Sequence, residues 1–147
     1  MRSLTPAGIA LIKRFEGFVA QPYLCPAGFL TIGYGHRVHL SERKAMQNGI
    51  TPAAAEELLL RDVAAAGRAV LRLIEVPLLN SQYDALVSFT FNLGSAALQR
   101  STLRQKINRN EHLDVPAELL KWVWAGGRKL PGLVARRAAE GARYWEG

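Results

Sequence analysis

Apolar residues near the N-terminus recur at the spacing of one helix face. Ile9, Ile12 and Phe15 follow this period, which is typical of an amphipathic helix. A threonine–proline pair stands before them and a glycine follows them, and these are common start and stop signals of helices. The pattern therefore predicts a helix over residues 5–16, with Glu16 in its last turn.

A second amphipathic pattern begins at another threonine–proline pair and continues for more than twenty residues. Its apolar stripe comprises Leu59, Val63, Ala66, Val70 and Ile74. A helix over residues 52–74 would span more than about 30 Å at the usual rise per residue. This helix is expected to join two lobes, one over about residues 1–60 and one over about residues 75–147.

The segment between these helices has the composition of strands and turns. β-branched and aromatic residues dominate residues 29–35, and a Pro-Ala-Gly turn at residues 26–28 separates them from residues 21–24. This pattern predicts a strand, a turn and a second strand. Residues 37–50 are polar and irregular, with a short helix expected after Ser41.

The C-terminal half is expected to be helical throughout. Capping residues and glycines bound four apolar segments, at about residues 82–93, 102–108, 116–124 and 131–144. No repeat and no low-complexity linker divides the sequence. The fold class is therefore α+β: one domain over residues 1–147, with a β-hairpin in a small N-terminal lobe and a helical C-terminal lobe.

Composition and charge narrow the class of protein. Hydrophobic residues make up 49% of the 147 residues, which supports a packed core and argues against disorder. The formal net charge is +7, and the excess of basic residues lies at the two ends of the chain. Such a surface attracts polyanions: nucleic acid, anionic membranes and wall polymers. No nucleic-acid motif accompanies the charge, so specific nucleic-acid binding is not expected.

Cysteine usage and the N-terminus point to synthesis in a reducing cytoplasm. Cys25 is the single cysteine, so an intramolecular disulfide is excluded. The N-terminal residues lack the apolar run of a signal peptide, and no stretch reaches the roughly 18 apolar residues of a membrane span. A protein of this kind would need help to act outside the cell in which it is made.

Glu16 is the only acidic residue before Glu42. At the C-terminal end of a helix it faces the negative end of the helix dipole, where the anionic form is disfavoured. A glycosidase needs a proton donor for the leaving oxygen, and a second group that holds water or stabilises positive charge. Glu16 is therefore a candidate general acid, although a glutamate before a glycine is more often a surface residue.

Several motifs occur in order over nearly the whole chain. They are Phe15-Glu16-Gly17-Phe18, residues 22–28, Leu30-Thr31-Ile32-Gly33-Tyr34-Gly35-His36, residues 84–94, residues 126–133, and Arg136-Arg137. Together they resemble the phage-type lysozymes of glycoside hydrolase family 24, which include the T-even and lambdoid phage endolysins. The resemblance implies a lysozyme-like fold and a muramidase. Such an enzyme hydrolyses the β-1,4 bond between N-acetylmuramic acid and N-acetylglucosamine in peptidoglycan and thereby lyses the host cell.

The resemblance assigns catalytic roles position by position. The general acid falls on Glu16, and the threonine that orients the attacking water falls on Thr31. The second catalytic position, nine residues after the acid and normally aspartate, falls on Cys25.

Substrate-binding positions fall on Tyr34, His36, Phe91 and Asn92. The resemblance gives His36 a structural hydrogen-bonding role, and core packing is the alternative for Phe91. His36 and His39 also form a candidate metal pair, but no third ligand is near them in sequence. Neither a metal nor a cofactor is therefore expected.

Three interpretations of Cys25 remain open. Its thiolate supplies the charge or base that aspartate would supply, or it stays neutral while Glu16 and Thr31 carry a slower, inverting hydrolysis, or the site is inactive and only binds glycan. An ordinary thiol has a pKa of about 8.5 and is mostly protonated near neutral pH. The thiolate interpretation therefore requires a nearby cation or hydrogen-bond donors that lower this pKa.

The resemblance further implies a monomer that binds peptidoglycan and reaches the periplasmic wall from the host cytoplasm through a holin-type membrane lesion. The alternative function is a catalytically impaired cationic protein that binds the wall or an anionic membrane. Membrane binding would fall to the last helix, where Arg136, Arg137 and Arg143 stand beside apolar residues.

Overall fold

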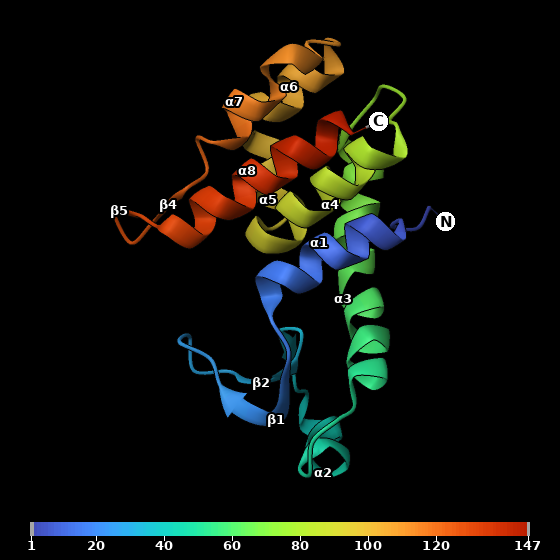
Figure 1. The fold of residues 1–147 in the computed structure, drawn as a ribbon, viewed down its shortest axis with the longest axis vertical. Coiled ribbons are helices and arrows are strands. Elements are labelled where there is room, and N and C mark those ends of the chain that lie inside the picture. The colour runs from blue at the N-terminus through green and yellow to red at the C-terminus, as the bar shows by residue number, and fades with distance from the viewer. Residues whose placement is uncertain (1, 147) are drawn as a thin grey trace. The chain divides into compact units, whose positions relative to one another are not determined.

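The computed structural model describes residues 2–146, and these form two compact units. The first, called the β unit here, comprises Glu16–Ala64; the second, the helical unit, comprises the chain up to Phe15 and from Ala65 onward. Figure 1 shows the elements of both units in chain order. The grouping differs from the expected lobes in one respect, because the N-terminal helix belongs with the C-terminal helices.

The β unit contains a three-stranded antiparallel sheet in the order β1-β2-β3. Its elements are β1 (Val19–Leu24), β2 (Leu30–Gly33), β3 (His36–Arg37), a 3-10 turn (Leu40–Glu42), α2 (Arg43–Met46) and the first part of α3 (Pro52–Leu73). The predicted strand–turn–strand and the short helix are confirmed. The two-residue strand β3 was not expected, because His36-Arg37 is too short to show a period of two.

Edge strand β1 is irregular in its middle. Val19 pairs with Gly33 and Tyr23 pairs with Thr31, so four steps along β1 match only two along β2. Pro22 lies in this bulged part of the edge strand, where its missing N–H removes no ladder hydrogen bond. The extra residues of β1 are left without partners in β2.

The turn between β1 and β2 follows from its sequence, Cys25-Pro26-Ala27-Gly28. Proline favours the second position of a four-residue turn, and glycine accepts the positive φ needed at the end. Gly28 has φ +87°, and its N–H donates to the carbonyl of Cys25 at 2.8 Å. The N–H of Cys25 donates to the carbonyl of Phe29 at 2.9 Å and closes the loop.

A small apolar core supports the sheet from one side. Ile32, Val38 and Leu58 are buried together, and partly buried apolar side chains pack against them. Because side chains alternate along a strand, Leu30 and Ile32 share the core face of β2, and Thr31 projects to the other face.

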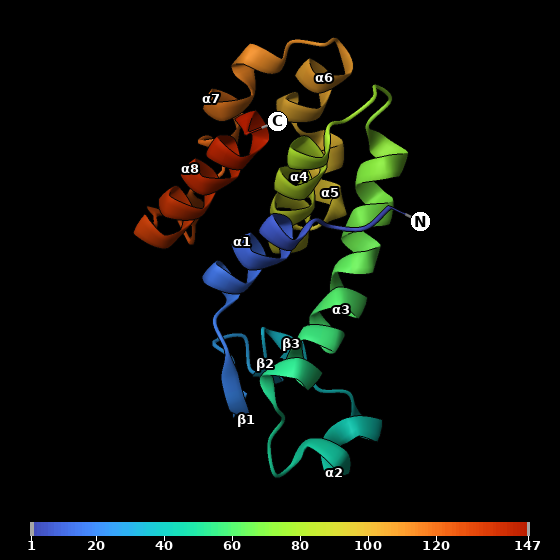
Figure 2. The same ribbon diagram turned by 45° about the vertical axis from the view of Figure 1, so that its right-hand side comes forward.

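The helical unit is built around one buried helix. Its elements are α1 (Pro6–Glu16, whose last residue falls in the β unit), the second part of α3, α4 (Asn80–Leu93), α5 (Ser95–Arg100), α6 (Thr102–Asn108), a 3-10 turn (His112–Asp114), α7 (Val115–Leu119), β4 (Trp124–Ala125), β5 (Arg128–Lys129) and α8 (Pro131–Trp145). Every residue of α4 from Ser81 to Thr90 is buried. Figure 2 shows α8 running alongside α4, and α7 in turn packs against α8. No helix within residues 2–146 has the length and apolar run of a membrane span.

A buried carboxylate on α4 anchors the N-terminal helix. Asp84 is completely buried and accepts hydrogen bonds from the backbone N–H of Thr5 at 3.0 Å and from the Thr5 hydroxyl. Arg143 of α8 donates to the same carboxylate from Nε at 3.1 Å and from Nη2 at 2.8 Å. The Thr5 hydroxyl also caps α1 by accepting from the N–H of Gly8 at 3.1 Å. One carboxylate therefore ties α1, α4 and α8 together.

The structure corrects the prediction over residues 116–124. The helix there ends at Leu119, and an unexpected hairpin of β4 and β5 follows, with Trp124 paired to Lys129. Gly126 and Gly127 both have positive φ, +57° and +76°, as a two-residue hairpin turn requires. Gly126 and Gly127, which were predicted to end a helix, therefore form the turn of a hairpin. Helix α5 was also missed; the long helix α3 and helices α4, α6 and α8 are confirmed.

Gly8→Ala is expected to destabilise the fold. A Cβ at Gly8 would lie 2.4 Å from the Asp84 carboxyl group, so the buried carboxylate and its partners would have to shift. Overpacking of this kind costs about 1–3 kcal/mol of unfolding free energy. Urea unfolding measures the loss. Gly132→Ala on α8 is the matched control, because nothing lies within 4 Å of its added methyl group. Unchanged stability of Gly8→Ala would contradict this account of the anchor.

Candidate active site

The candidate acid Glu16 lies against the turn between β2 and β3. It is the last residue of α1, and Gly17 ends the helix with φ +70°. A Cβ at Gly35 would lie 2.9 Å from Oε1 of Glu16. Gly35 also has a positive φ, +74°, so only glycine suits this turn both in conformation and in space. The carboxyl group is half-buried.

Cys25 and Thr31 lie together at the opposite end of the β1–β2 hairpin. Cys25 begins the turn after β1, and Thr31 is the second residue of β2. Thr31 is buried, and Cys25 is partly exposed. The structure thus brings Cys25 and Thr31 together, and Glu16 ends the helix that precedes this hairpin.

Backbone N–H groups of the turn act on the Cys25 thiol. The N–H of Phe29 has the largest effect and lowers the pKa of the Cys25 thiol; burial opposes it, and the N–H groups of Ala27 and Gly28 and the Thr31 hydroxyl lower the pKa further. The net direction is down from the ordinary value. A thiolate here is stabilised by hydrogen bonds from the main chain and one hydroxyl, with no cation among these causes.

The Thr31 hydroxyl has two acceptors within reach. It donates to the carbonyl of Phe29 at 2.9 Å, and it is also one of the groups that lower the pKa of Cys25. A hydroxyl has one proton and two lone pairs. Whichever acceptor takes the proton, Oγ1 keeps lone pairs that accept a hydrogen bond from a water molecule.

His36 is held between two carboxylates inside the β unit. Its Nδ1 lies 2.8 Å from Oδ2 of Asp62 on α3, and its Nε2 lies 3.0 Å from Oε1 of Glu42. The backbone N–H of His39 donates to the same oxygen of Glu42 at 2.9 Å. His36 is buried and both ring nitrogens are occupied. These contacts support the structural role of His36 and leave neither ring nitrogen for direct contact with a substrate.

These contacts shift the pKa values of His36 and Glu42 in opposite directions. Burial lowers the pKa of His36, but the hydrogen bonds and charges of Asp62 and Glu42 outweigh it, so the net shift is upward. Burial raises the pKa of Glu42, but the N–H of His39 and the His36 ring outweigh it, so the net shift is downward. Both directions indicate a charged histidine paired with an ionised Glu42.

The remaining predicted residues are Tyr34 in the β unit and Phe91 and Asn92 in the helical unit. Tyr34 is half-buried and packs against Phe18 with ring centroids 5.5 Å apart. Phe91 and Asn92 lie near the end of α4 in the helical unit and are partly exposed. Nη2 of Arg137 donates to Oδ1 of Asn92 at 2.8 Å, which leaves the amide N–H groups of Asn92 to donate to a ligand.

A pocket of about 460 Å³ in the helical unit includes Asn92. Phe15, the residue before Glu16, and Arg136 also line it, together with Leu130, Pro131, Gly132 and Leu133. Its apolar walls with one amide and one guanidinium group resemble the usual composition of a ligand site.

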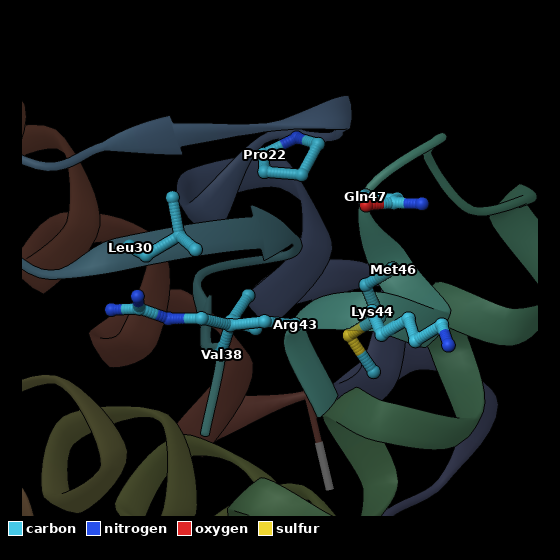
Figure 3. Close-up of a pocket in the computed structure, with 7 residues that line it drawn as sticks. All are labelled: Pro22, Leu30, Val38, Arg43, Lys44, Met46 and Gln47. Carbon is cyan, nitrogen blue, oxygen red and sulfur yellow. The ribbon is translucent and has the colours of Figure 1, made fainter. Parts of the chain in front are cut away.

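A second pocket, of about 480 Å³, lies in the β unit. Figure 3 shows Leu30 and Val38 on its apolar side, with the side chains of Arg43 and Lys44 extending away from one another. Leu30 belongs to the core face of β2, opposite to Thr31. None of Glu16, Cys25 and Thr31 lines this pocket, so it is not part of the candidate active site.

The structure corrects the expectation that the last helix offers a cationic membrane face. Arg136 and Arg137 are buried. Nε of Arg137 lies 2.7 Å from Oε1 of the buried Glu140, which also accepts from Ser88 at 2.6 Å. Arg143 is paired with Asp84 and Glu146. The arginines of α8 therefore stabilise the interior, because buried charges need partners.

Comparisons with known proteins agree with the geometry. The family model described as phage lysozyme matches residues 13–140. The chain belongs to the phage lysozyme family. It is 39% identical to the endolysin of Acyrthosiphon pisum secondary endosymbiont phage 1, over 96% of this chain and 97% of that protein. It is 40% identical to the endolysin of Bacillus phage B103 over 99% of this chain, and spans 55% of that longer protein.

The fold agrees with that of a solved family member. The crystal structure of the P22 lysozyme mutant L86M superposes with a TM-score of 0.89 at 32% identity, over 98% of this chain and 99% of the other. The α+β, lysozyme-like fold class is therefore confirmed. Membership in the family makes the chain a glycosidase-type enzyme with peptidoglycan as its class of substrate.

Sequence reasoning did not find the residues that hold the site in place. Asp62 is 26 residues after His36, and neither Asp62 nor Arg137 stands in a motif that indicates its partner. Glu42 had a weak signal, as the next acidic residue after Glu16. No group of three or more His, Cys, Asp or Glu side chains within residues 2–146 is arranged to hold a metal ion.

The stability contributed by His36 is expected to depend on pH. The raised pKa of His36 gives stability that is complete below its ordinary value of about 6.5 and is lost as pH rises through the folded value. The lowered pKa of Glu42 gives stability that is present above its ordinary value of about 4.3 and is lost as pH falls. Both contributions coincide between about pH 4.5 and 6.5.

Urea unfolding of the wild type and of His36→Asn checks this expectation. The difference in unfolding free energy should be larger at pH 5.5 than at pH 8.5. His39→Asn is the matched control, because the contact of that residue with Glu42 uses its backbone N–H. A difference that does not change with pH would show that His36 is neutral in the folded protein.

Proposed function

We propose that this protein is a muramidase that hydrolyses the β-1,4 bond between N-acetylmuramic acid and N-acetylglucosamine, and that Glu16, Cys25 and Thr31 carry the reaction. The observation that supports this assignment best is the lowered pKa of the Cys25 thiol, which lies in a turn whose N–H groups at Phe29, Ala27 and Gly28 stabilise the thiolate. These donors favour an anion at the position where the family normally has aspartate.

Glu16 acts as the general acid in this proposal. Its carboxyl proton passes to the glycosidic oxygen as the bond to the anomeric carbon breaks, which removes the need to expel an alkoxide. The contact with Gly35 restricts the carboxyl group to one side of the β2–β3 turn. A fixed donor lowers the entropy cost of reaching the transition state.

Cys25 and Thr31 act on the attacking water. Oγ1 of Thr31 accepts a hydrogen bond from the water and orients it, and the Cys25 thiolate takes a proton from it as the hydroxyl oxygen bonds to the anomeric carbon. One water is consumed, Glu16 becomes a carboxylate and Cys25 becomes a thiol. Cys25 then releases its proton to solvent and Glu16 takes one up, which restores the starting state.

The proposal extends to the biological setting. Relatives of this chain are named endolysins, which supports an action on the host cell wall. In our proposal the enzyme is made in the host cytoplasm, passes through a holin-type membrane lesion and lyses the cell by cutting its wall. It acts as a monomer. The alternative, a cationic binding protein without activity, loses its main support because the arginines of α8 are buried or paired.

Glu16→Gln is expected to abolish turnover, because an amide of the same shape has no carboxyl proton to donate. Loss of a general acid lowers kcat/KM by about 10²–10⁴-fold. The measurement is the loss of turbidity of outer-membrane-permeabilised Gram-negative cells, with product sugars identified by their reducing ends. Glu56→Gln, on α3, is a control of the same chemistry. Lysis by Glu16→Gln at the wild-type rate would refute the enzymatic assignment.

Cys25 variants separate the three interpretations of that residue. If the thiolate is the base, Cys25→Ser and Cys25→Ala should lower kcat/KM by about 10²-fold, and Cys25→Asp should retain or exceed wild-type activity. Iodoacetamide should inactivate the wild type and leave Cys25→Asp unaffected. Because a thiol titrates at higher pH than a carboxyl group, wild-type activity should extend to higher pH than that of Cys25→Asp.

Full activity of both Cys25→Ser and Cys25→Ala would rule out the thiolate as the base and leave Glu16 with Thr31 as the catalytic pair. Inactivity of the wild type, together with strong activity of Cys25→Asp, would show that the natural site only binds glycan.

A further inference from the structure

The hairpin of β4 and β5 stands out in the helical unit as a small, rigid and exposed element. It projects beyond the first turn of α8 (Figure 1), and all residues from Trp124 to Leu130 are exposed. The N–H of Leu130 donates to the carbonyl of Val123 at 3.0 Å and closes its base. A two-residue turn built on two positive-φ glycines holds one backbone conformation, so the exposed side chains are presented in a fixed arrangement.

The hairpin carries cationic charge without acidic neighbours. No acidic residue occurs between Glu118 and Glu140 in the sequence. Lys106 and Lys121 of the same unit pair with Glu118. Within the described chain, by contrast, neither Arg128 nor Lys129 makes an ion pair. Lys129 is paired with Trp124, which is 62% exposed, so these two side chains share one face of the hairpin. Arg128 is paired with Ala125 and projects to the other face.

The hairpin is continuous with the pocket that contains Asn92. Leu130 closes the base of the hairpin and also lines that pocket, followed by Pro131 and Gly132. Phe15, which precedes the catalytic acid, lines the same pocket. A polymer that occupies the pocket and continues past Leu130 therefore meets Trp124, Arg128 and Lys129 next.

We propose that this hairpin binds the carboxylate-bearing peptide branch of peptidoglycan while the glycan lies in the adjoining pocket. The inference rests on the proposed function, which supplies a polymer with a neutral sugar backbone and anionic peptide branches. Lys129 pairs with a carboxylate on the face where Trp124 covers the apolar part of the branch, and Arg128 pairs with a second carboxylate at the other face of the hairpin. An anionic membrane fits less well, because membrane binding scales with buried apolar area and the hairpin offers only Trp124 and Leu130.

The test compares two substrates and two double variants. The substrates are Gram-negative sacculi with intact peptide branches and the same glycan strands after an amidase has removed the branches. The first variant is Arg128→Gln with Lys129→Gln. The matched control is Arg68→Gln with Arg72→Gln, which removes the same charge from exposed positions of α3.

The hairpin variant should raise KM for intact sacculi about fivefold with kcat unchanged, as expected when a contact acts equally in ground and transition states. Its KM for branch-free glycan should equal that of the wild type, and its melting temperature should be unchanged. The control variant should behave like the wild type on both substrates. A wild type that cuts neither substrate would refute the proposed function itself.

Two results would overturn the inference while leaving the proposed function intact. One is an unchanged KM of the hairpin variant on intact sacculi. The other is an equal rise in KM for both substrates or for both variants, which would indicate general charge attraction. Binding to phosphatidylglycerol vesicles is measured in parallel; loss of vesicle binding with unchanged KM would assign the hairpin to membranes.

Discussion

The buried carboxylate of Asp84 is the interaction on which the helical unit depends most. It lies on the central helix and accepts hydrogen bonds from the first and the last helix, which are 138 residues apart at Thr5 and Arg143. A buried carboxylate is costly unless its oxygens are paired, so all three segments must be in place together. Because α1 ends at Glu16, the same interaction fixes the start of the element that presents the candidate acid.

The candidate site combines two kinds of constraint. Glycines with positive φ at residues 17, 28 and 35 shape the turns around it. The contacts of His36 with the carboxylates of Glu42 and Asp62 attach the sheet to α3. The three residues proposed to carry the chemistry lie at the end of α1 and on the β1–β2 hairpin. Polar contacts between residues far apart in the sequence fix the position of the sheet. The backbone of the local turn sets the environment of Cys25. Different residues therefore determine the fold of the β unit and the chemistry of the thiol.

Much of the fold could be predicted from periodicity, and the failures have identifiable causes. Helices such as α3 have long apolar stripes and clear starts. The β4–β5 hairpin was missed because two-residue strands show no period, and Leu119, Leu120 and Val123 before it follow the spacing of a helix face. Asp62 and Asp84 could not be paired with His36 and Thr5, since sequence carries no signal of contacts so far apart. The positions of Glu16, Cys25 and Thr31 came from family resemblance, and their environment came only from the structure.

The donors around Cys25 belong almost entirely to the main chain, and this has an evolutionary consequence. Main-chain N–H groups persist through side-chain substitution, so the loop retains its preference for an anion whatever residue stands at its start. An acceptor can therefore be exchanged, sulfur for oxygen, without any compensating change nearby. A substitution at position 25 therefore leaves the hydrogen-bond donors of the loop in place. Related proteins with an aspartate or a cysteine at this position can keep the same loop conformation.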